Sequence, residues 1–375
     1  MFFVKRREKR YYLLSNSCYG GLPVIRARVV GAAGFGGANI IELLTAHPEA
    51  EVVSLVDVQG VGRPISDQHT HLKDVCDVVV SAPDDASWDD SIDIVFTATP
   101  DRVGMTLAEA CLKAGARMID YSGDFRFNSA QAYARYAERI GRDPVHAAAG
   151  LLPRSTYGLT ELHRDEVKKT SLVGNPGCFA VSAILGAAPA VREGLIDLDT
   201  IIFDAKTGVS GAGIKAAQTF HYPLRYENMN AYKIGAHQHN FEVERELSIL
   251  AGAELKATLT TQVVPLCRGI MTTVYGQLTS PSTTTGELFD AYKAYYDGSR
   301  FVRVEPQGTP TSNNDVRGSN LCILSINVDA RTGRMIVVSH IDNLMKGQAG
   351  SALQNMNVMF GLDESLGLRR PAFYP

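Results

Sequence analysis

Short apolar runs alternate with amphipathic stretches through the first half of the chain. The runs are nearly continuous, as in parallel strands that are buried on both faces, and the stretches between them carry apolar residues at helical spacing. This alternation is typical of a doubly wound α/β domain with a parallel sheet. The expected strands are Val24–Val30, Glu51–Val56, Ile92–Ala98, Arg117–Asp120 and Ser171–Val173.

Beyond about residue 195 the pattern changes to strands in which apolar and polar residues alternate. Such alternation is typical of antiparallel strands with one face covered and one face exposed. It predicts a second, α+β domain with helices on one face of its sheet, while the Ser/Thr-rich stretch 280–286 indicates a surface loop. The expected strands are Thr200–Thr207, Lys256–Pro265, Met271–Thr279, Leu321–Asp329 and Arg334–Ile341.

Composition adds limits to this picture. A chain of 375 residues is too long for one ordinary core, which supports two domains. A formal net charge of −3 and a pI near 6.3 disfavour nucleic acid and anionic membranes as partners. Six scattered cysteines without a C-x-x-C pair indicate a reducing compartment such as the cytoplasm, with neither a disulfide framework nor a zinc site. No apolar run reaches the length of a membrane-spanning helix.

The first 23 residues stand apart from both domains. Five basic residues crowd positions 5–10, and the apolar stretch that follows is too short for a signal-peptide core. We expect a disordered basic tail or an early start codon, with a transit peptide as the weaker alternative. The segment is left out of the predicted fold.

A glycine-rich turn joins the first expected strand to the first expected helix. Its spacing is G-x-x-G-x-x-G over Gly31–Gly37, and the second strand ends at Asp57. Strand, turn, helix, strand and acid form the layout of a dinucleotide-binding unit, although a tight turn without a ligand has the same glycines. Asp57 favours NAD over NADP, whereas Arg63 is near enough in sequence to serve a 2′-phosphate. The expected cofactor contacts are Gly31, Gly34, Phe35, Gly36, Gly37, Asp57 and Pro100.

The sequence Gly174-Asn175-Pro176-Gly177-Cys178-Phe179 places a cysteine just after a tight turn. The Ala-rich run 180–191 that follows is typical of a helix. A thiol at a helix N-terminus lies near unpaired backbone N–H groups, which favour the thiolate. Cys178 is therefore a candidate nucleophile, and the alternative is a small buried apolar residue.

A reactive thiolate requires an acid/base partner, most often histidine. His237 and His239 lie in a loop after Gly235 and are the best candidates; a metal site or an exposed structural pair are the alternatives. Arg126 follows another strand end, where it either clamps an anionic group or forms an ion pair with Asp124. A thiol beside a dinucleotide suggests interconversion of an acyl group and an aldehyde through a thioester.

These motifs together resemble the N-acetyl-gamma-glutamyl-phosphate reductase family of arginine biosynthesis. The resemblance runs in order from about residue 26 to the end. Its most specific segments surround Cys178 and Lys346, while the glycine fingerprint is shared with aspartate-semialdehyde dehydrogenases. The matching segments are 31–37, 120–126, Tyr157-Gly-Leu159, Gly174–Cys178, Gly208–Gly213, Gly235–His239 and Asp342–Gly347.

The resemblance implies roles for residues in those segments. Cys178 would form the thioester and expel phosphate, His237 would be the acid/base residue, and NADPH would supply hydride to give N-acetylglutamate 5-semialdehyde. Homodimers or homotetramers are expected. Asn343 and Lys346 are assigned to the cofactor, and the residues assigned to the substrate are Arg126, Asn175, Ser210, Gly211 and His239.

The C-terminal helix is expected to return and complete the first domain. The dinucleotide-binding domain would then comprise residues 24–176 and 345–375, and the catalytic, substrate-binding and dimerisation domain residues 177–344. The fold class is therefore α/β, a Rossmann-type domain joined to an α+β domain.

Two positions depart from the family pattern. Gln238 stands where the family has an arginine between its histidines, and glutamine is not a bidentate cation. Asp57 is the second departure, because many members carry Ser and Arg near that turn for a 2′-phosphate. The alternatives are therefore a reductase of another acyl phosphate (carrier-linked aminoadipyl or glutamyl phosphate, or aspartyl phosphate) and a non-catalytic dinucleotide sensor, with NAD(H) possible as the cofactor.

Overall fold

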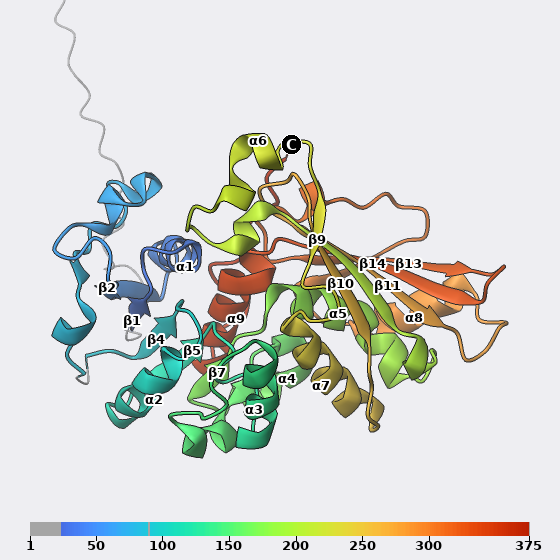
Figure 1. The fold of residues 1–375 in the computed structure, drawn as a ribbon, viewed down its shortest axis with the longest axis horizontal. Helices are drawn as coiled ribbons and strands as arrows, with labels where there is room; N and C mark the ends of the chain where they lie inside the picture. The colour runs from blue at the N-terminus through green and yellow to red at the C-terminus, as the bar shows by residue number, and fades with distance from the viewer. Residues whose placement is uncertain (1–23, 89–90, 375) are drawn as a thin grey trace, which may run out of the picture.

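The computed structural model describes residues 24–88 and 91–374, so the predicted basic tail lies outside the described residues. Two seven-stranded sheets lie side by side, with helices packed on them (Figure 1). The fold class expected from the sequence, a Rossmann-type domain plus an α+β domain, is confirmed. Within the described ranges, no helix is long and apolar enough to cross a membrane.

The first sheet is entirely parallel, with strand order β3-β2-β1-β4-β5-β7-β6. The five predicted strands are all present, and the two short strands β3 and β6 were not predicted. Strand β4 is buried along its whole length between β1 and β5, as its apolar sequence requires. The strands are β1 (Ile25–Val30), β2 (Ala50–Val56), β3 (Val80–Ser81), β4 (Ile94–Thr97), β5 (Arg117–Asp120), β6 (Thr156–Tyr157) and β7 (Leu172–Gly174).

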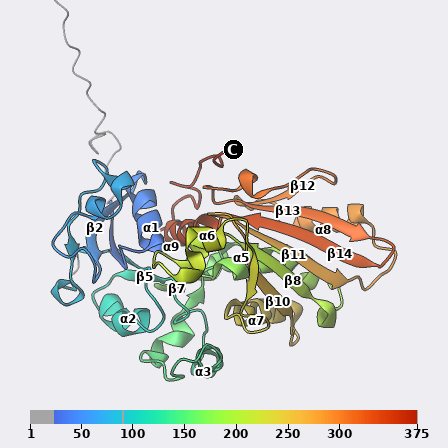
Figure 2. The same ribbon diagram turned by 45° about the horizontal axis from the view of Figure 1, so that its top comes forward.

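Helices from both ends of the chain cover this sheet. The C-terminal helix lies beside α1 in both ribbon views (Figures 1 and 2), and Ile40, Leu353 and Met356 belong to one buried cluster. This packing supports our proposed division of the chain, in which residues 345–375 complete the first domain. The helices are α1 (Phe35–Thr45), α2 (Gly104–Lys113), α3 (Ala130–Arg139), α4 (Thr160–Val167) and α9 (Gly350–Met359).

The second sheet has the order β12-β13-β14-β11-β8-β10-β9 and is mixed rather than wholly antiparallel. The pairs β8–β10 and β12–β13 are parallel, and the others are antiparallel. All five predicted strands are present, whereas the short edge strands β9 and β12 were not predicted. The strands are β8 (Ile202–Thr207), β9 (Asn230–Tyr232), β10 (Thr258–Val263), β11 (Ile270–Gln277), β12 (Val302–Glu305), β13 (Cys322–Asp329) and β14 (Arg334–Ile341).

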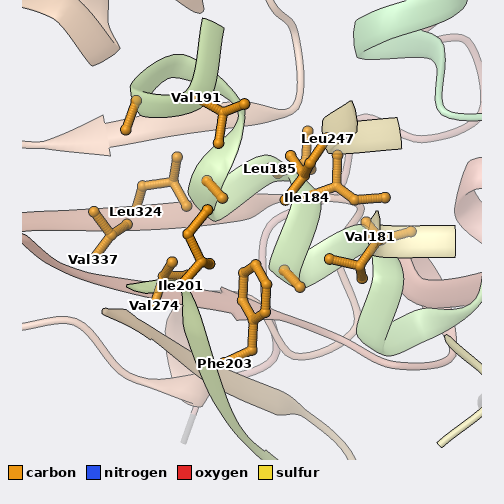
Figure 3. Close-up of a cluster of buried hydrophobic side chains, with 14 of the residues drawn as sticks. Val181, Ile184, Leu185, Val191, Ile201, Phe203, Leu247, Val274, Leu324 and Val337 are labelled. Carbon is orange, nitrogen blue, oxygen red and sulfur yellow. The ribbon is translucent and has the colours of Figure 1, made fainter. Parts of the chain in front are cut away.

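Helix α5 (Cys178–Arg192) is the centre of the second domain (Figure 3). Every residue from Phe179 to Val191 is buried, because the helix lies between the sheet and α7 (His239–Ala251). Its alanines allow close packing, and each large apolar side chain contributes about 1.5–3 kcal/mol on burial. Helix α8 (Thr285–Tyr295) also packs on the sheet; its capping box between Thr284 and Glu287 ends the predicted surface loop.

Candidate functional site

A cavity of about 740 Å³ lies where the two domains meet. Both domains contribute lining residues, and the lining joins the glycine-rich turn to the cysteine turn and the histidine loop. The predicted site residues that line the cavity are Gly34, Phe35, Gly36, Pro100, Arg126, Cys178, Ser210, Gly211, His237, His239 and Asn343.

The glycine-rich turn presents backbone N–H groups to this cavity. Gly34 is the N-cap of α1 and makes no side-chain cap, so the amides of the first helical turn are free for an anion. Gly31 has a φ of +85°, and a Cβ there would lie 2.4 Å from the carbonyl oxygen of Ala98. A Cβ on Gly37 would be equally close to the Gly31 carbonyl oxygen. Gly31 and Gly37 therefore allow close packing of the chain, while Gly34–Gly36 form the cradle that fits a pyrophosphate.

Asp57 is held against the same turn. Its Oδ2 accepts a hydrogen bond from the backbone N–H of Ala33 at 2.9 Å, and its Oδ1 accepts one from Gln59 at 2.9 Å. Arg63 is mostly exposed and pairs with Asp67 at 3.0 Å. Asp57 therefore shapes the phosphate-binding turn in addition to any contact with a ribose.

Cys178 is the first residue of α5, as the sequence predicts. Gly177 is the N-cap, and Gly347 lies so close that a Cβ on it would be 2.7 Å from Cys178 Cβ. Gly347 belongs to a π-helical turn, Met345–Ala349, and donates its N–H to the Asp342 carbonyl at 2.9 Å. The nucleophile is therefore held between the start of one helix and a turn that only glycine fits.

The protonation state of Cys178 differs from the one expected from its place at a helix N-terminus. Burial raises the pKa of its thiol to about 11, although the backbone N–H of Phe179 and the charge of Arg126 act in the opposite direction. The helix N-terminus is present, but desolvation of the charged form outweighs it. The resting group is a neutral thiol, and the prediction of a favoured thiolate is wrong for this state.

A buried carboxylate, Glu242, connects the cysteine turn to the rest of the site. It accepts hydrogen bonds from the Gly177 N–H at 2.9 Å and the Tyr157 hydroxyl at 2.9 Å, and it forms an ion pair with Arg126 at 2.7 Å. The sequence analysis did not identify Glu242 as a site residue. The sequence pattern that could have indicated it is its place beside Val243 on the side of helix α7 that also carries Leu247.

The guanidinium group of Arg126 therefore makes most of its hydrogen bonds within the protein. Besides Glu242, its Nε donates to the carbonyl of Asn175 at 2.8 Å and its NH2 to that of Tyr121 at 2.5 Å. The expected alternative partner, Asp124, instead accepts the backbone N–H groups of Arg102 and Met105. The ion pair with Asp124 was thus a wrong alternative, and a direct clamp on the substrate stays a prediction.

The two histidines form a buried, neutral pair. Their ring centres are 4.6 Å apart, and His237 Nδ1 accepts the backbone N–H of His239 at 3.1 Å. That bond places the proton of neutral His237 on Nε2, which lies 3.5 Å from the Tyr232 hydroxyl. Burial lowers the pKa of His237 to about 2 and also lowers the pKa of His239. The alternative of an exposed structural pair is wrong, since both rings are buried.

Five predicted site residues do not line the cavity: Gly31, Gly37 and Asp57, which shape the glycine-rich turn, and Asn175 and Lys346. Lys346 is fully buried, donates to Glu161 at 2.6 Å and to Gln354 at 2.8 Å, and is absent from the cavity wall. Its contacts are therefore structural here, and its assignment to the cofactor stays a prediction. Asn175 is likewise buried, with its amide donating to the Gln348 carbonyl at 3.0 Å, and its assignment to the substrate stays a prediction.

Asn343 and Ser210 face the cavity but also bond to each other. Asn343 Nδ2 donates to Ser210 Oγ at 3.0 Å, and Asn343 Oδ1 accepts the N–H of Gly269 at 2.8 Å. Within residues 24–88 and 91–374, no group of three or more His, Cys, Asp or Glu side chains is arranged to hold a metal ion.

Comparison with known proteins agrees with this geometry. Residues 26–170 match the semialdehyde dehydrogenase NAD binding domain, and residues 178–343 match the semialdehyde dehydrogenase dimerisation domain. N-acetyl-gamma-glutamyl-phosphate reductases from Geobacter sp. (strain M21) and Desulforudis audaxviator are each 42% identical over 94% of this chain and 100% of their own length.

Solved structures show the same fold at low sequence identity. Aspartate semialdehyde dehydrogenase II from Vibrio cholerae, complexed with ASA, has a TM-score of 0.69 at 14% identity, covering 91% of this chain and 99% of its own. The enzyme from Candida albicans with NADP has a TM-score of 0.64 at 16% identity, covering 90% and 98%. The first domain is thus an NAD(P)-binding domain, and the chain belongs to the N-acetyl-gamma-glutamyl-phosphate reductase family of NAD(P)-dependent semialdehyde dehydrogenases.

Proposed function

We propose that this protein reduces N-acetyl-gamma-glutamyl phosphate to N-acetylglutamate 5-semialdehyde and phosphate, with Cys178 as nucleophile. The observation that carries the proposal is the single cavity that joins a pyrophosphate cradle to Cys178 at the start of α5. The named relatives, which align over nearly the whole chain, support the same reaction.

Cys178 begins the reaction as a neutral thiol. Its sulfur forms a bond to the acyl carbon, the bond from that carbon to the phosphate oxygen breaks, and the thiol proton leaves with the phosphate. The N–H groups at the start of α5 favour the negative charge that develops on sulfur and oxygen as the bonds change. A thioester on Cys178 and free phosphate are the products of this step.

His237 acts on the oxygen of the acyl group. Its Nδ1 is occupied by the His239 N–H, so its Nε2–H is the group available as a hydrogen-bond donor. A neutral imidazole donor polarises a carbonyl without adding a charge to the site, and its low pKa keeps it neutral across the working pH range. We therefore propose an oxyanion-stabilising role for His237, with Tyr232 as its neighbour.

The glycine cradle fits a dinucleotide, which when bound supplies hydride for reduction of the acyl group. We propose NADPH as the preferred cofactor, supported by the similar Candida albicans structure with NADP, with NADH as the alternative because Asp57 follows the end of β2. A homodimer or homotetramer in the cytoplasm completes the proposal, supported by the match to a dimerisation domain and by the biosynthetic relatives.

A second candidate is a reductase of a related acyl phosphate. Gln238 favours it, since this residue has no positive charge and accepts a hydrogen bond from Lys233 at 2.7 Å. A dinucleotide sensor is less well supported, because it would need neither Cys178 nor the neutral histidine beside it.

The reverse reaction tests the proposal. Purified protein is mixed with N-acetylglutamate 5-semialdehyde, phosphate and either NADP or NAD, and formation of reduced cofactor is followed by absorbance. We expect phosphate-dependent reduction that Cys178→Ser abolishes while dinucleotide binding is retained. If protein that binds dinucleotide gives no signal with either cofactor, another acyl substrate or a sensor is indicated.

A further inference from the structure

Arg225 is a buried cation without an anionic partner among the described residues. It ends the short helix α6 (Tyr222–Arg225), its side chain is 7% exposed, and it lines the catalytic cavity. Its Nη1 donates to Asn230 Oδ1 at 2.7 Å and its Nη2 to the Asn228 carbonyl at 2.6 Å, both neutral acceptors. Its Nε is buried with no hydrogen-bond partner in the structure. A buried charge is unfavourable unless an opposite charge meets it.

Each of the other cationic side chains that line the cavity has a bonding partner or is exposed to solvent. Arg126 is neutralised by Glu242, and Lys233 donates to Gln238. Arg142 is exposed to solvent, which screens its charge. Asp101 is the one carboxylate among the described lining residues, and it accepts the Gly123 N–H at 2.7 Å. Among the described lining residues, Arg225 is thus the buried positive charge that no carboxylate neutralises, and a bound anion could pair with it.

The segment that carries Arg225 belongs to the wall opposite the dinucleotide cradle. The second domain contributes residues 208–214 and 219–220 to the lining together with Arg225, Asn230, Tyr232 and Lys233, whereas Gly34–Gly36 come from the first domain. Asn228 and Asn230 accept hydrogen bonds from two of the guanidinium nitrogens and so fix the orientation of the group. Because both acceptors are neutral, the positive charge is not cancelled. A planar fork held in this way matches a carboxylate.

We propose that Arg225 binds the α-carboxylate of the acyl-phosphate substrate and so determines specificity; this inference rests on the proposed function. In N-acetyl-gamma-glutamyl phosphate the carboxylate is separated from the reacting carbon by the α-carbon and two methylene groups, so it lies away from Cys178 while the phosphate lies beside the reacting carbon. Arg225 supplies the bidentate cation that Gln238 lacks.

The reverse reaction separates carboxylate from phosphate, because the two anions are then on different molecules. For Arg225→Gln we expect the KM for N-acetylglutamate 5-semialdehyde to rise about 10- to 100-fold, as for loss of a charged hydrogen bond. The KM values for phosphate and for NADP should change less than about twofold, within the range of surface substitutions. Arg225→Lys, which keeps the charge but not the fork, should give an intermediate rise. Lys215→Gln, an exposed change on the same segment outside the cavity lining, is the control for net charge.

A substrate analogue provides a second, independent readout. 4-Acetamidobutanal is the same aldehyde without its carboxylate; the wild-type protein should discriminate against it, and Arg225→Gln should lose that discrimination. A rise in the KM for phosphate or NADP alone, or discrimination that survives in Arg225→Gln, would overturn the proposal. Thermal unfolding and dinucleotide binding of each variant exclude misfolding, and a wild-type protein without phosphate-dependent turnover would instead refute the proposed function.

Discussion

The polar groups on the two sides of Cys178 are arranged in opposite ways. On one side, the buried Glu242 pairs with Arg126, which also lines the cavity, and accepts hydrogen bonds from Tyr157 and the N–H of Gly177. On the other side, the segment 211–236 is largely exposed, and its one buried arginine retains an unpaired nitrogen. The difference indicates that the nucleophile is positioned by bonds made during folding, whereas the opposite wall leaves groups unpaired for a ligand.

The largest effect on catalysis is expected from substitution of His237, which lines the cavity and packs against Phe179, the residue that follows Cys178. His237→Asn should lower kcat in the reverse reaction by roughly 10²- to 10⁴-fold, because it removes the Nε2–H donor from the reacting oxygen. His239→Asn should cost less, since its backbone N–H, the group that fixes His237, is kept. Steady-state kinetics of both variants decide the matter, and a greater loss for His239→Asn would reverse the assignment.

A stability effect of about 3–5 kcal/mol is expected for Glu242→Gln, because Arg126 would be left as an uncompensated buried charge. Denaturant unfolding monitored by circular dichroism measures this effect. The matched control is Glu254→Gln, at a mostly exposed position, which should change the free energy of unfolding by less than about 0.5 kcal/mol. Equal values for the two variants would mean that the buried network does not hold the cysteine turn.

The smallest effect on stability is expected from a substitution in the exposed segment 211–236. Tyr222 is 70% exposed and stacks only on Tyr226, with ring centres 5.2 Å apart. Tyr222→Ser should change the stability of the isolated chain by less than about 0.5 kcal/mol in the same unfolding assay. A loss of several kcal/mol would show that this segment is packed, in an oligomer for example, and would remove the contrast between the two sides.

Sequence patterns predicted those parts of the molecule that depend on local spacing. The glycine turn, the start of α5 at Cys178 and ten of the fourteen strands in the two sheets follow from periodicity and turn chemistry over a few residues. Arg126 and Glu242 are 116 positions apart, so neither residue's neighbours reveal their pairing. For the same reason Lys346, whose motif suggested a cofactor contact, is matched to Glu161, 185 positions away.

Arg225 illustrates a different limit of sequence reasoning. It lies in a segment of mixed aromatic and polar residues with no periodicity, and its burial depends on how the loop folds over the cavity. The edge strands β9 and β12 were missed, whereas the equally short β4, β5 and β7 were predicted because they fit the regular alternation of strand and helix in the first domain.

The neutral state of Cys178 also affects how the protein withstands peroxide. Desolvation raises the pKa of its thiol to about 11, which disfavours the thiolate at neutral pH, and the thiolate is the form that peroxide attacks. Redox-sensing cysteines have the opposite property, a low pKa that makes them oxidise readily. The half-buried position of Cys178 therefore disfavours the peroxide-sensitive form between turnovers.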